Sequence, residues 1–344
     1  METTPVLQVE GLNKAYSRKG ESVRAVNNVG FSVHAGEIVG VLGPNGSGKT
    51  TTLKAICGLT ELDAGTVRLD GNDIRLGQQT AMRRTGAVLE GARNVYWRLT
   101  PVENIVYFAG LKGLARQEAR RRAETLIERL SLGDYRNQQV RMLSKGNQQK
   151  VAIACALVHQ PALILLDEPT LGLDVDMVRG MKAWLRELVD ESRSALLVTS
   201  HDMDFIEAIC DRVIILYRGE VISESSVDEL RRLYAPQKTF VLQVDGHLSG
   251  NTEKALTRFP WRVETNGASS RLCLRTGELD ILSASLAILA EGGHTLNDIN
   301  VTSDTLEDIF LHTLNQNLNH NVSQTHTQSG HGGITKSMDS EDKQ

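Results

Sequence analysis

The fold is decided by one stretch of sequence, Gly43-Pro44-Asn45-Gly46-Ser47-Gly48-Lys49-Thr50. The glycines let the backbone curl with its N–H groups pointing inward, an arrangement that suits an anion. Lys49 is placed to reach phosphate groups, and the Thr50 hydroxyl is placed to hold Mg²⁺. The flanks fit, since residues 36–42 predict a buried strand and residues 51–57 predict a helix with a positive N-terminus. The alternative, a glycine-rich turn that happens to carry a lysine, leaves this strand-to-helix context unexplained. We therefore predict a phosphate-binding loop.

The composition is that of an ordinary globular protein. The chain has 344 residues, of which 40% are hydrophobic and 23% are charged, enough for one large or two ordinary domains. A net charge of -4 argues against a nucleic-acid-binding surface, so no nucleic acid is expected as a partner. No apolar run approaches the roughly 18 residues of a membrane-spanning helix, and the polar start lacks the pattern of a signal peptide. The chain is therefore expected in the cytoplasm, where its four cysteines, which form no CxxC pair, would stay reduced.

Strand and helix patterns alternate over the first two thirds of the chain. Thr100, Pro101 and Glu103 predict the start of a helix, because they match a capping hydroxyl, a first-position proline and a capping-box glutamate. Strands are predicted at residues 6–10, 29–34, 36–42, 65–71, 162–166 and 195–199, and further helices at 116–130, 148–159 and 177–191. The basic run at the start of the 116–130 helix is read as a solvated face, with a membrane or partner surface as the alternative. The order of the elements predicts a doubly wound α/β sheet.

The last third of the chain has its own pattern. The first domain, residues 1–234, is predicted to end before a short linker. Strands are predicted at residues 240–244, 262–265, 271–274 and 296–301, and helices at 252–259 and 278–290. This β-α-β-β-α-β order predicts a small α+β domain over residues 239–314. A last helix is predicted at 304–314, and the polar residues 315–344 predict a disordered tail.

Two predicted strands are followed by residues whose side chains could take part in catalysis. Residues 162–166 lead into Asp167 and Glu168, and residues 195–199 are followed closely by His201. The carboxyl ends of central parallel strands lie at the ligand edge of such a sheet, so these side chains fit the hydrolysis of a nucleoside triphosphate. The alternatives are a second metal ligand or an acidic helix cap for Glu168, and a buried histidine with satisfied hydrogen bonds for His201.

One further stretch identifies a family. Leu143-Ser144-Lys145-Gly146-Asn147-Gln148-Gln149-Lys150 resembles the signature motif of the nucleotide-binding subunits of ABC transporters. The resemblance covers about residues 6–234, and the ordered set of motifs is more specific than any single one. It implies a P-loop NTPase fold of the ABC ATPase type, with a helical subdomain at about residues 91–160. It also implies an ATPase that binds ATP and Mg²⁺ and pairs with a second ATP-binding subunit, as a homodimer.

The resemblance assigns roles residue by residue. Lys49, Glu168 and His201 would be catalytic, with Glu168 polarising the attacking water and His201 binding the γ-phosphate. Asp167 and Thr50 would hold the Mg²⁺ shell. The nucleotide contacts would be Tyr16 on the adenine, and Gly43, Pro44, Asn45, Gly46, Ser47, Gly48, Lys49, Thr50 and Thr51 on the phosphates. Ser144 and Gly146 would contact the γ-phosphate bound by the other subunit, and Asp174 would link the two sites.

Three residues depart from the family pattern. Lys145 stands where the family usually has glycine, and Asn147 where it usually has glutamine. Glu90 replaces the glutamine that senses Mg²⁺; a glutamate can still coordinate a cation or a water, so it is kept as a metal-site residue. The catalytic carboxylate, the lysine and Asp167 are all retained. Hydrolysis is therefore still expected.

Two segments, residues 89–101 and 305–311, resemble the branch that exports drugs, antibiotics and polysaccharides. In that branch the ATPase and the integral membrane permease are separate chains, so the permease would hold this chain at the cytoplasmic face of the cell membrane. Tyr96, Trp97 and Arg98 would face the permease, with packing inside the helical subdomain as the alternative for the two aromatics.

Other functions of the superfamily fit less well. A chromosome-maintenance ATPase needs a long coiled coil between the phosphate-binding loop and the signature, and this interval is too short. A translation factor needs two phosphate-binding loops in one chain. A regulatory ATP-binding module without a transport partner remains the alternative.

Overall fold

The computed structural model describes residues 4–18, 21–90, 94–229, 238–266, 269–276 and 279–303. The predicted helix at 304–314, the predicted tail at 315–344 and the predicted domain boundary near residue 234 lie outside the described residues. Among the helices in the described ranges, none is both long and apolar enough to span a bilayer.

A six-stranded sheet lies at the centre of the first part of the chain, with strand order β10-β9-β3-β8-β7-β6. The strands are β3 (Ile38–Leu42), β6 (Thr85–Val88), β7 (Leu163–Asp167), β8 (Ala195–Thr199), β9 (Arg212–Tyr217) and β10 (Glu220–Ser226). All pair in parallel except β10, which pairs antiparallel with β9. Every residue of β3, β7 and β8 is buried, as their continuous apolar runs predict. The predicted doubly wound sheet is confirmed, and β3, β8 and β7 lie next to one another with their carboxyl ends at one edge.

A second sheet, with order β2-β1-β4-β5, is antiparallel. It comprises β1 (Leu7–Arg18), β2 (Glu21–Val33), β4 (Ala64–Leu69) and β5 (Asn72–Asp73). Its apolar side chains and those of α1 (Lys49–Ile56) form one buried cluster with Val39, Val41 and Leu165 of the central sheet. The sequence predicted only the outer ends of the β1–β2 hairpin. Residues 11–18 are largely polar, so their strand conformation depends on pairing with β2 rather than on a buried face.

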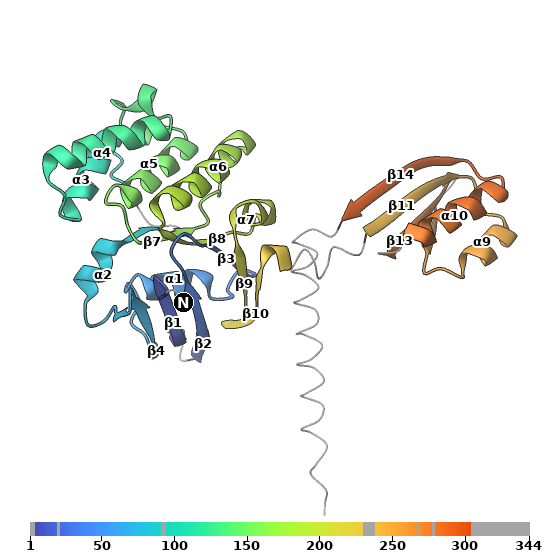
Figure 1. Ribbon diagram of the computed structural model, residues 1–344, viewed down its shortest axis with the longest axis horizontal. Helices are drawn as coiled ribbons and strands as arrows, with labels where there is room; N and C mark the ends of the chain where they lie inside the picture. Colours follow the sequence, from blue (N-terminus) through green and yellow to red (C-terminus); the bar gives the residue numbers. More distant parts are fainter. Residues whose placement is uncertain are drawn as a thin grey trace, which may run out of the picture.

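Helices pack on the other face of the central sheet (Figure 1). They are α3 (Pro101–Leu111), α4 (Arg116–Arg129), α5 (Lys145–Leu157) and α6 (Val175–Ser192), with 3₁₀ turns at Gly133–Tyr135 and Val140–Met142. The predicted capping box of α3 is present: Thr100 Oγ1 accepts from the N–H of Glu103, and the Glu103 carboxylate accepts from the N–H of Thr100. Helix α5 begins three residues before its predicted start. Two short helices, α2 (Gln78–Arg84) and α7 (Met203–Ile209), were not predicted.

Two of the four arginines in the basic run of α4 form ion pairs. Arg121 and Arg122 both bind the Glu118 carboxylate, and Arg122 also donates to the carbonyl of Val158. The helix instead buries Ala119, Ala123 and Ile127. The pattern agrees with a solvated face.

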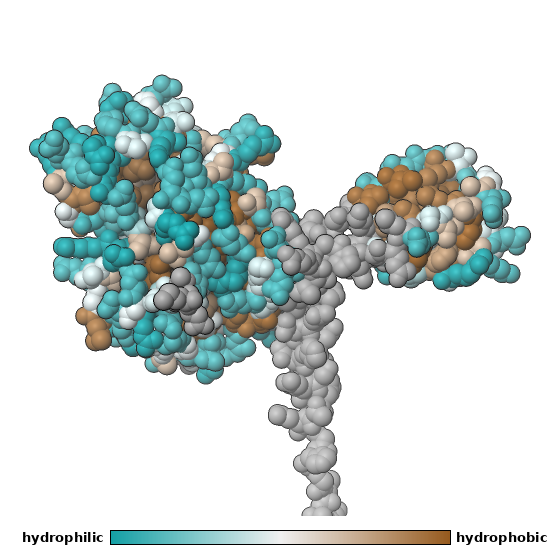
Figure 2. Space-filling model, viewed as in Figure 1, coloured by the Kyte–Doolittle hydropathy of each residue, from teal (hydrophilic) through white to brown (hydrophobic). Residues whose placement is uncertain are grey.

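The C-terminal elements have the predicted β-α-β-β-α-β order. They are β11 (Lys238–Asp245), α9 (Gly250–Leu256), β12 (Arg262–Asn266), β13 (Ser269–Thr276), α10 (Leu279–Glu291) and β14 (Leu296–Ser303). Their antiparallel sheet has the order β12-β13-β11-β14, and its own buried cluster includes Leu242, Leu256 and Leu289. Figure 2 shows hydrophobic side chains gathered on this unit, where Ile299 and Val301 of β14 are exposed.

Candidate active site

The loop from residue 43 to residue 48 joins the end of β3 to the start of α1. Its backbone lies close to two strands: a Cβ on Gly43 would be 2.3 Å from the carbonyl oxygen of Leu216, and one on Gly48 would be 2.5 Å from that of Ala25. Gly48 also has a φ of 108°, in the region that favours glycine. The neighbouring strands therefore fix the loop, and only glycine fits at these two positions.

Lys49 is the first residue of α1, and it is only 8% exposed. Its Nζ donates to the carbonyl oxygens of Gly43 (2.7 Å) and Pro44 (3.4 Å). Within the described part of the chain, no carboxylate forms an ion pair with it. The Ser47 hydroxyl is buried and has no hydrogen-bond partner among the described residues. A buried ammonium without a counter-ion, an unsatisfied hydroxyl and a helix N-terminus together fit a phosphate group.

Asp167, the last residue of β7, is buried and firmly held. The Thr199 hydroxyl at the end of β8 donates to its Oδ1 at 2.6 Å, and the N–H of Glu90 lies 3.4 Å from its Oδ2. The Glu90 side chain itself is exposed. No group of three His, Cys, Asp or Glu side chains that could hold a metal ion is found in the residues that the structure describes. Mg²⁺ in nucleotide sites is commonly bound by one or two protein carboxylates together with substrate phosphates, and the Asp167 carboxylate is of the kind that such a cation prefers.

Glu168 and His201 meet directly across the ends of β7 and β8. His201 Nδ1 lies 2.7 Å from Glu168 Oε2, and the backbone N–H of His201 donates to the same oxygen at 3.3 Å. The His201 side chain is 66% exposed and that of Glu168 is 10% exposed. His201 is thus not the buried histidine of the alternative interpretation. One carboxylate oxygen is held by the histidine, and the other has no partner among the described residues.

Glu168 has an unusual backbone conformation, with a φ of 50°. Its N–H donates to both the carbonyl oxygen and the hydroxyl of Thr199, each at 3.1 Å. Thr199 therefore contacts both acids, but the sequence did not single it out. The available signal was a threonine that ends an otherwise apolar buried strand.

The signature stretch begins α5. Ser144 is the N-cap, with its hydroxyl accepting from the N–H of Asn147 at 3.3 Å, and it is exposed together with Lys145. Gly146 is buried, and a Cβ there would lie 2.0 Å from the sulfur of Met177 at the start of α6. Asp174 caps α6 by accepting from the N–H of Met177 at 2.9 Å. No hydrogen bond in the described residues joins Ser144 or Gly146 to the loop at 43–51.

Tyr16 lies on β1, is 41% exposed, and has the Lys14 ammonium 5.6 Å from its ring centre. Lys14 is held in turn by Asp63 at 2.8 Å. An exposed aromatic ring of this kind offers a flat face for stacking. No hydrogen bond of the described residues connects Tyr16 with the phosphate-binding loop.

The backbone of the segment at Tyr96 and Trp97 is fixed by hydrogen bonds, whereas the two side chains are exposed. The side chain of Asn104 bonds both the N–H of Tyr96 (2.7 Å) and its carbonyl oxygen (3.0 Å). The carbonyl of Trp97 accepts from the N–H of Arg141 at 3.0 Å. Tyr96 packs edge-on against Tyr107, but it is 50% exposed and Trp97 is 56% exposed. Tyr96 therefore packs inside the helical subdomain on one side only. Trp97 is too exposed for such packing to explain its position.

Comparison with known proteins gives consistent similarities. Residues 26–171 match the family described as ABC transporter. The chain is 39% identical over 218 residues to the ABC transporter ATP-binding protein NatA of Bacillus subtilis (strain 168), covering 63% of this chain and 88% of NatA. It is 36% identical over 233 residues to the daunorubicin/doxorubicin resistance ATP-binding protein DrrA of Streptomyces peucetius, covering 67% of this chain and 69% of DrrA.

The similarity extends to solved structures. The dimeric structure of the bacterial ABC transporter cassette MJ0796 matches with a TM-score of 0.60 and 30% identity, covering 64% of this chain and 98% of that chain. A dimeric post-hydrolysis state of the same cassette, bound to ADP and Pi, matches over the same shares with 30% identity and a TM-score of 0.59.

Proposed function

Because the chain belongs to the family of ABC transporter ATP-binding proteins, and is an ATPase of that family, we propose that it dimerises around two ATP molecules and powers export through a separately encoded membrane permease. One observation carries the proposal. The phosphate-binding loop follows β3, His201 follows β8, and Asp167 and Glu168 end β7, and these three strands are neighbours in the sheet. A triphosphate at the loop would therefore face the carboxylates and the histidine.

The residues divide the chemistry of hydrolysis among them. Lys49 and the loop N–H groups bind and orient the phosphates, and Thr50 and Asp167 would hold Mg²⁺, which when bound neutralises phosphate charge. Glu168 would accept a proton from a water in line with the γ-phosphate; without nucleotide, its Oε2 is bound to His201 and its Oε1 has no partner among the described residues.

The hydrogen bond to Glu168 restricts what His201 can do at the same time. In the neutral ring, Nδ1–H donates to Glu168, so Nε2 carries no proton and only accepts. To donate also to a γ-phosphate oxygen, His201 must be protonated, or it must release Glu168. We propose that, when the triphosphate binds, His201 releases Glu168 and donates to a γ-phosphate oxygen instead. The Glu168 carboxylate is then free to bind the water.

A second copy of the chain would complete each site. The positively polarised N-terminal end of α5 begins with Ser144 and Lys145, which are both exposed. Within one copy this end has no hydrogen bond to the loop among the described residues, so it is available to a phosphate held by the partner. The dimer of the similar cassette MJ0796 supports a homodimer.

The exposed segment at Tyr96, Trp97 and Arg98 is the proposed contact with the permease. With Leu99 and Tyr107 it surrounds a hollow of ≈ 330 Å³. Aromatic and arginine side chains are enriched where interfaces bind most strongly. The similarity to DrrA, a daunorubicin/doxorubicin resistance protein, supports export, and the permease would keep this chain at the cytoplasmic face of the cell membrane.

Co-purification from membranes tests the permease contact. The tagged full chain is expected to retain an integral membrane protein after detergent extraction, and Trp97→Glu is expected to lose it. Leu76→Glu is the matched control, because Leu76 is also an exposed apolar side chain, at 91%, on another part of the surface. If no membrane protein is retained, or if both variants behave alike, the chain is a regulatory ATP-binding module or its permease contact lies elsewhere.

A further inference from the structure

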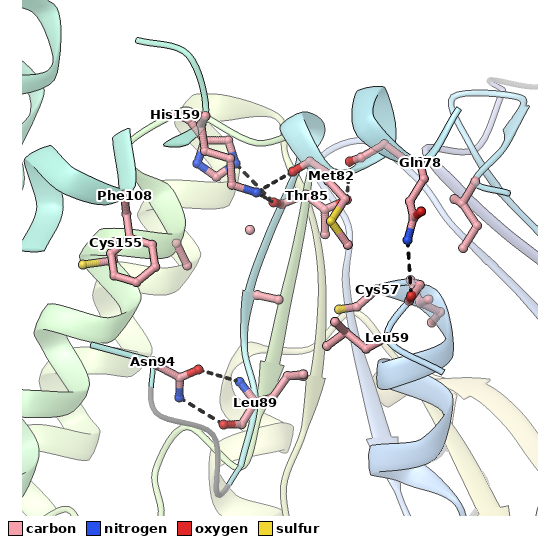
Figure 3. A pocket seen from close by; sticks show the side chains of 18 of the residues that line it. Cys57, Leu59, Gln78, Met82, Thr85, Leu89, Asn94, Phe108, Cys155 and His159 are labelled. Carbon is pink, nitrogen blue, oxygen red and sulfur yellow. Dashed lines mark hydrogen bonds between the residues drawn. The ribbon is translucent and has the colours of Figure 1, made fainter. Parts of the chain in front are cut away.

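A cavity of ≈ 470 Å³ lies where the helices α3 and α5 meet the end of α1, α2 and β6 (Figure 3). None of the acids of the proposed active site lines it. Its walls are mainly apolar, from Ile56, Ile74, Met82, Leu89 and Phe108. A volume of this size falls in the range of roughly 300–1,000 Å³ that small-molecule pockets occupy.

Lys112 brings a positive charge into this apolar cavity. It directly follows α3, and its Nζ donates to the carbonyl oxygens of Met82 and, at 3.0 Å, Thr85. An ammonium has three N–H groups, so one remains after these two bonds. No Asp or Glu lines the cavity, and no carboxylate of the described residues forms an ion pair with Lys112. Burial lowers the pKa of Lys112, as expected for a cation without a counter-ion.

The other titratable groups of the cavity do not offset this charge. Burial lowers the pKa of His159 to about 4, so the ring is neutral at pH 7 and its Nε2 lies 3.2 Å from the carbonyl oxygen of Thr85. Burial raises the pKa of the Cys57 thiol to about 12, and it also raises the pKa of Cys155. Neither thiol is therefore ionised at pH 7. The cavity holds one net positive charge in an apolar surrounding, which is costly without an anion.

We propose that this cavity is a binding site for a small carboxylic acid with an apolar body, whose carboxylate pairs with Lys112 and whose body contacts the apolar walls. The charge selects the anion, and the lining selects the apolar chain. Such a ligand would contact α2 and β6 on one side and α3 and α5 on the other, and Lys112 already joins the end of α3 to α2 and β6. It would therefore restrict movement of the helical part against the sheet.

Sodium octanoate is the probe for a direct binding test with the full chain, without nucleotide. Isothermal titration calorimetry is expected to give one octanoate per chain. Octanol, which has the same chain without the charge, and acetate, which has the charge without the chain, are expected to bind at least about tenfold more weakly. Equal binding of octanol would show an apolar pocket without anion recognition, and no octanoate binding would show no site; either result overturns the proposal.

Variants test the role of Lys112 itself. Lys112→Met is expected to weaken octanoate binding about tenfold or more, and Lys112→Arg to retain it. Lys182→Met is the control, because that ammonium also donates to a backbone carbonyl, Asp204 at 2.9 Å, but outside the cavity. Unchanged binding in Lys112→Met overturns the proposal.

A second variant tests the proposal independently, in case Lys112→Met does not fold. Gln78→Glu keeps the size of an exposed residue that lines the cavity and adds a negative charge there. It is expected to weaken octanoate binding severalfold and to leave octanol unaffected. If octanoate binds Gln78→Glu as tightly as wild type, the carboxylate does not sit in this cavity. The readout is binding alone, so failure here leaves the proposed transport function untouched.

Discussion

At the scale of single residues, the candidate site depends on a few hydrogen bonds between neighbouring strand ends. Glu168 adopts a left-handed conformation that a residue with a side chain adopts at a cost of order 1 kcal/mol or more. Two hydrogen bonds from its N–H to Thr199 hold it there. The same threonine orients Asp167, so one hydroxyl positions both acids.

Thr199→Val should therefore lower ATPase activity by about tenfold or more, because valine has the shape of threonine but cannot donate to Asp167 or accept from the N–H of Glu168 through a hydroxyl. Steady-state phosphate release measures the effect. Thr80→Val, at an exposed threonine of α2, is the control and should leave the rate unchanged. Equal rates for the two variants would show that Thr199 only fills space.

The sequence predicted Asp167, Glu168, Lys49 and His201 as site residues. Each has a side chain suited to phosphate binding or catalysis, and each lies at or after the end of an apolar strand. The sequence did not predict the His201–Glu168 contact or the role of Thr199. Both depend on β7 and β8 being adjacent in space although 27 residues separate Asp167 from Ala195. Sequence spacing does not encode that pairing.

At the scale of elements, local signals predicted some helices well and missed others. Helix α3 was predicted from its capping box, which is a property of four consecutive residues. Helices α2 and α7 have only seven residues each, too short for a clear periodic pattern. Helix α5 starts with Gly146 and Asn147 in its first turn, both weak helix formers, and packing of Gly146 against Met177 offsets this weakness.

The α3 cap makes a measurable contribution to stability. Thr100→Ala removes the hydroxyl that accepts from Glu103 and should lower the free energy of unfolding by about 1 kcal/mol. Thr100→Ser keeps the hydroxyl and should lose far less. Urea unfolding of both variants against wild type measures the difference; an equal loss would mean that the methyl group, not the hydrogen bond, matters.

The contact of His159, which follows α5, with Thr85 of β6 should make the free energy of unfolding depend on pH. The pKa of His159 is lowered to about 4 in the folded chain, so the unfolded chain binds more protons between pH 6.5 and 4. Stability is therefore lost on acidification through this window, by about 2 kcal/mol from this residue between pH 7 and pH 5. Unfolding of His159→Gln should lack this component, whereas substitution of the exposed His247 by Gln should retain it. The same acid sensitivity in all three proteins would contradict the assignment.

At the scale of the whole molecule, the buried clusters are separate. Two clusters belong to the first part of the chain and share the central sheet, and the third contains only residues from 242 onward. Fold class was predictable because periodicity and motif order are continuous within each part. The sequence could not predict which strands of the two large sheets pair, since that pairing joins distant segments.

Separate cores predict that the first part folds without the last. A chain ending at residue 237 should bind ATP with the affinity of the full chain and keep its thermal midpoint within a few degrees, because no residue of its two cores is removed. Calorimetry and nucleotide titration measure both properties. Aggregation of the shortened chain, or lost ATP binding, would show that the C-terminal unit is part of the same folding unit.

The central claim is that two copies of the chain enclose ATP and that Glu168 drives its hydrolysis. The most direct test measures Mg²⁺-dependent ATPase activity and the oligomeric state in ATP for wild type, Glu168→Gln and the exposed-residue control Glu187→Gln. We predict that Glu168→Gln is slower by about a hundredfold or more and accumulates as an ATP-bound dimer, while wild type and the control turn over ATP alike. A Glu168→Gln chain that hydrolyses at the wild-type rate, or that stays monomeric in ATP, would contradict the account.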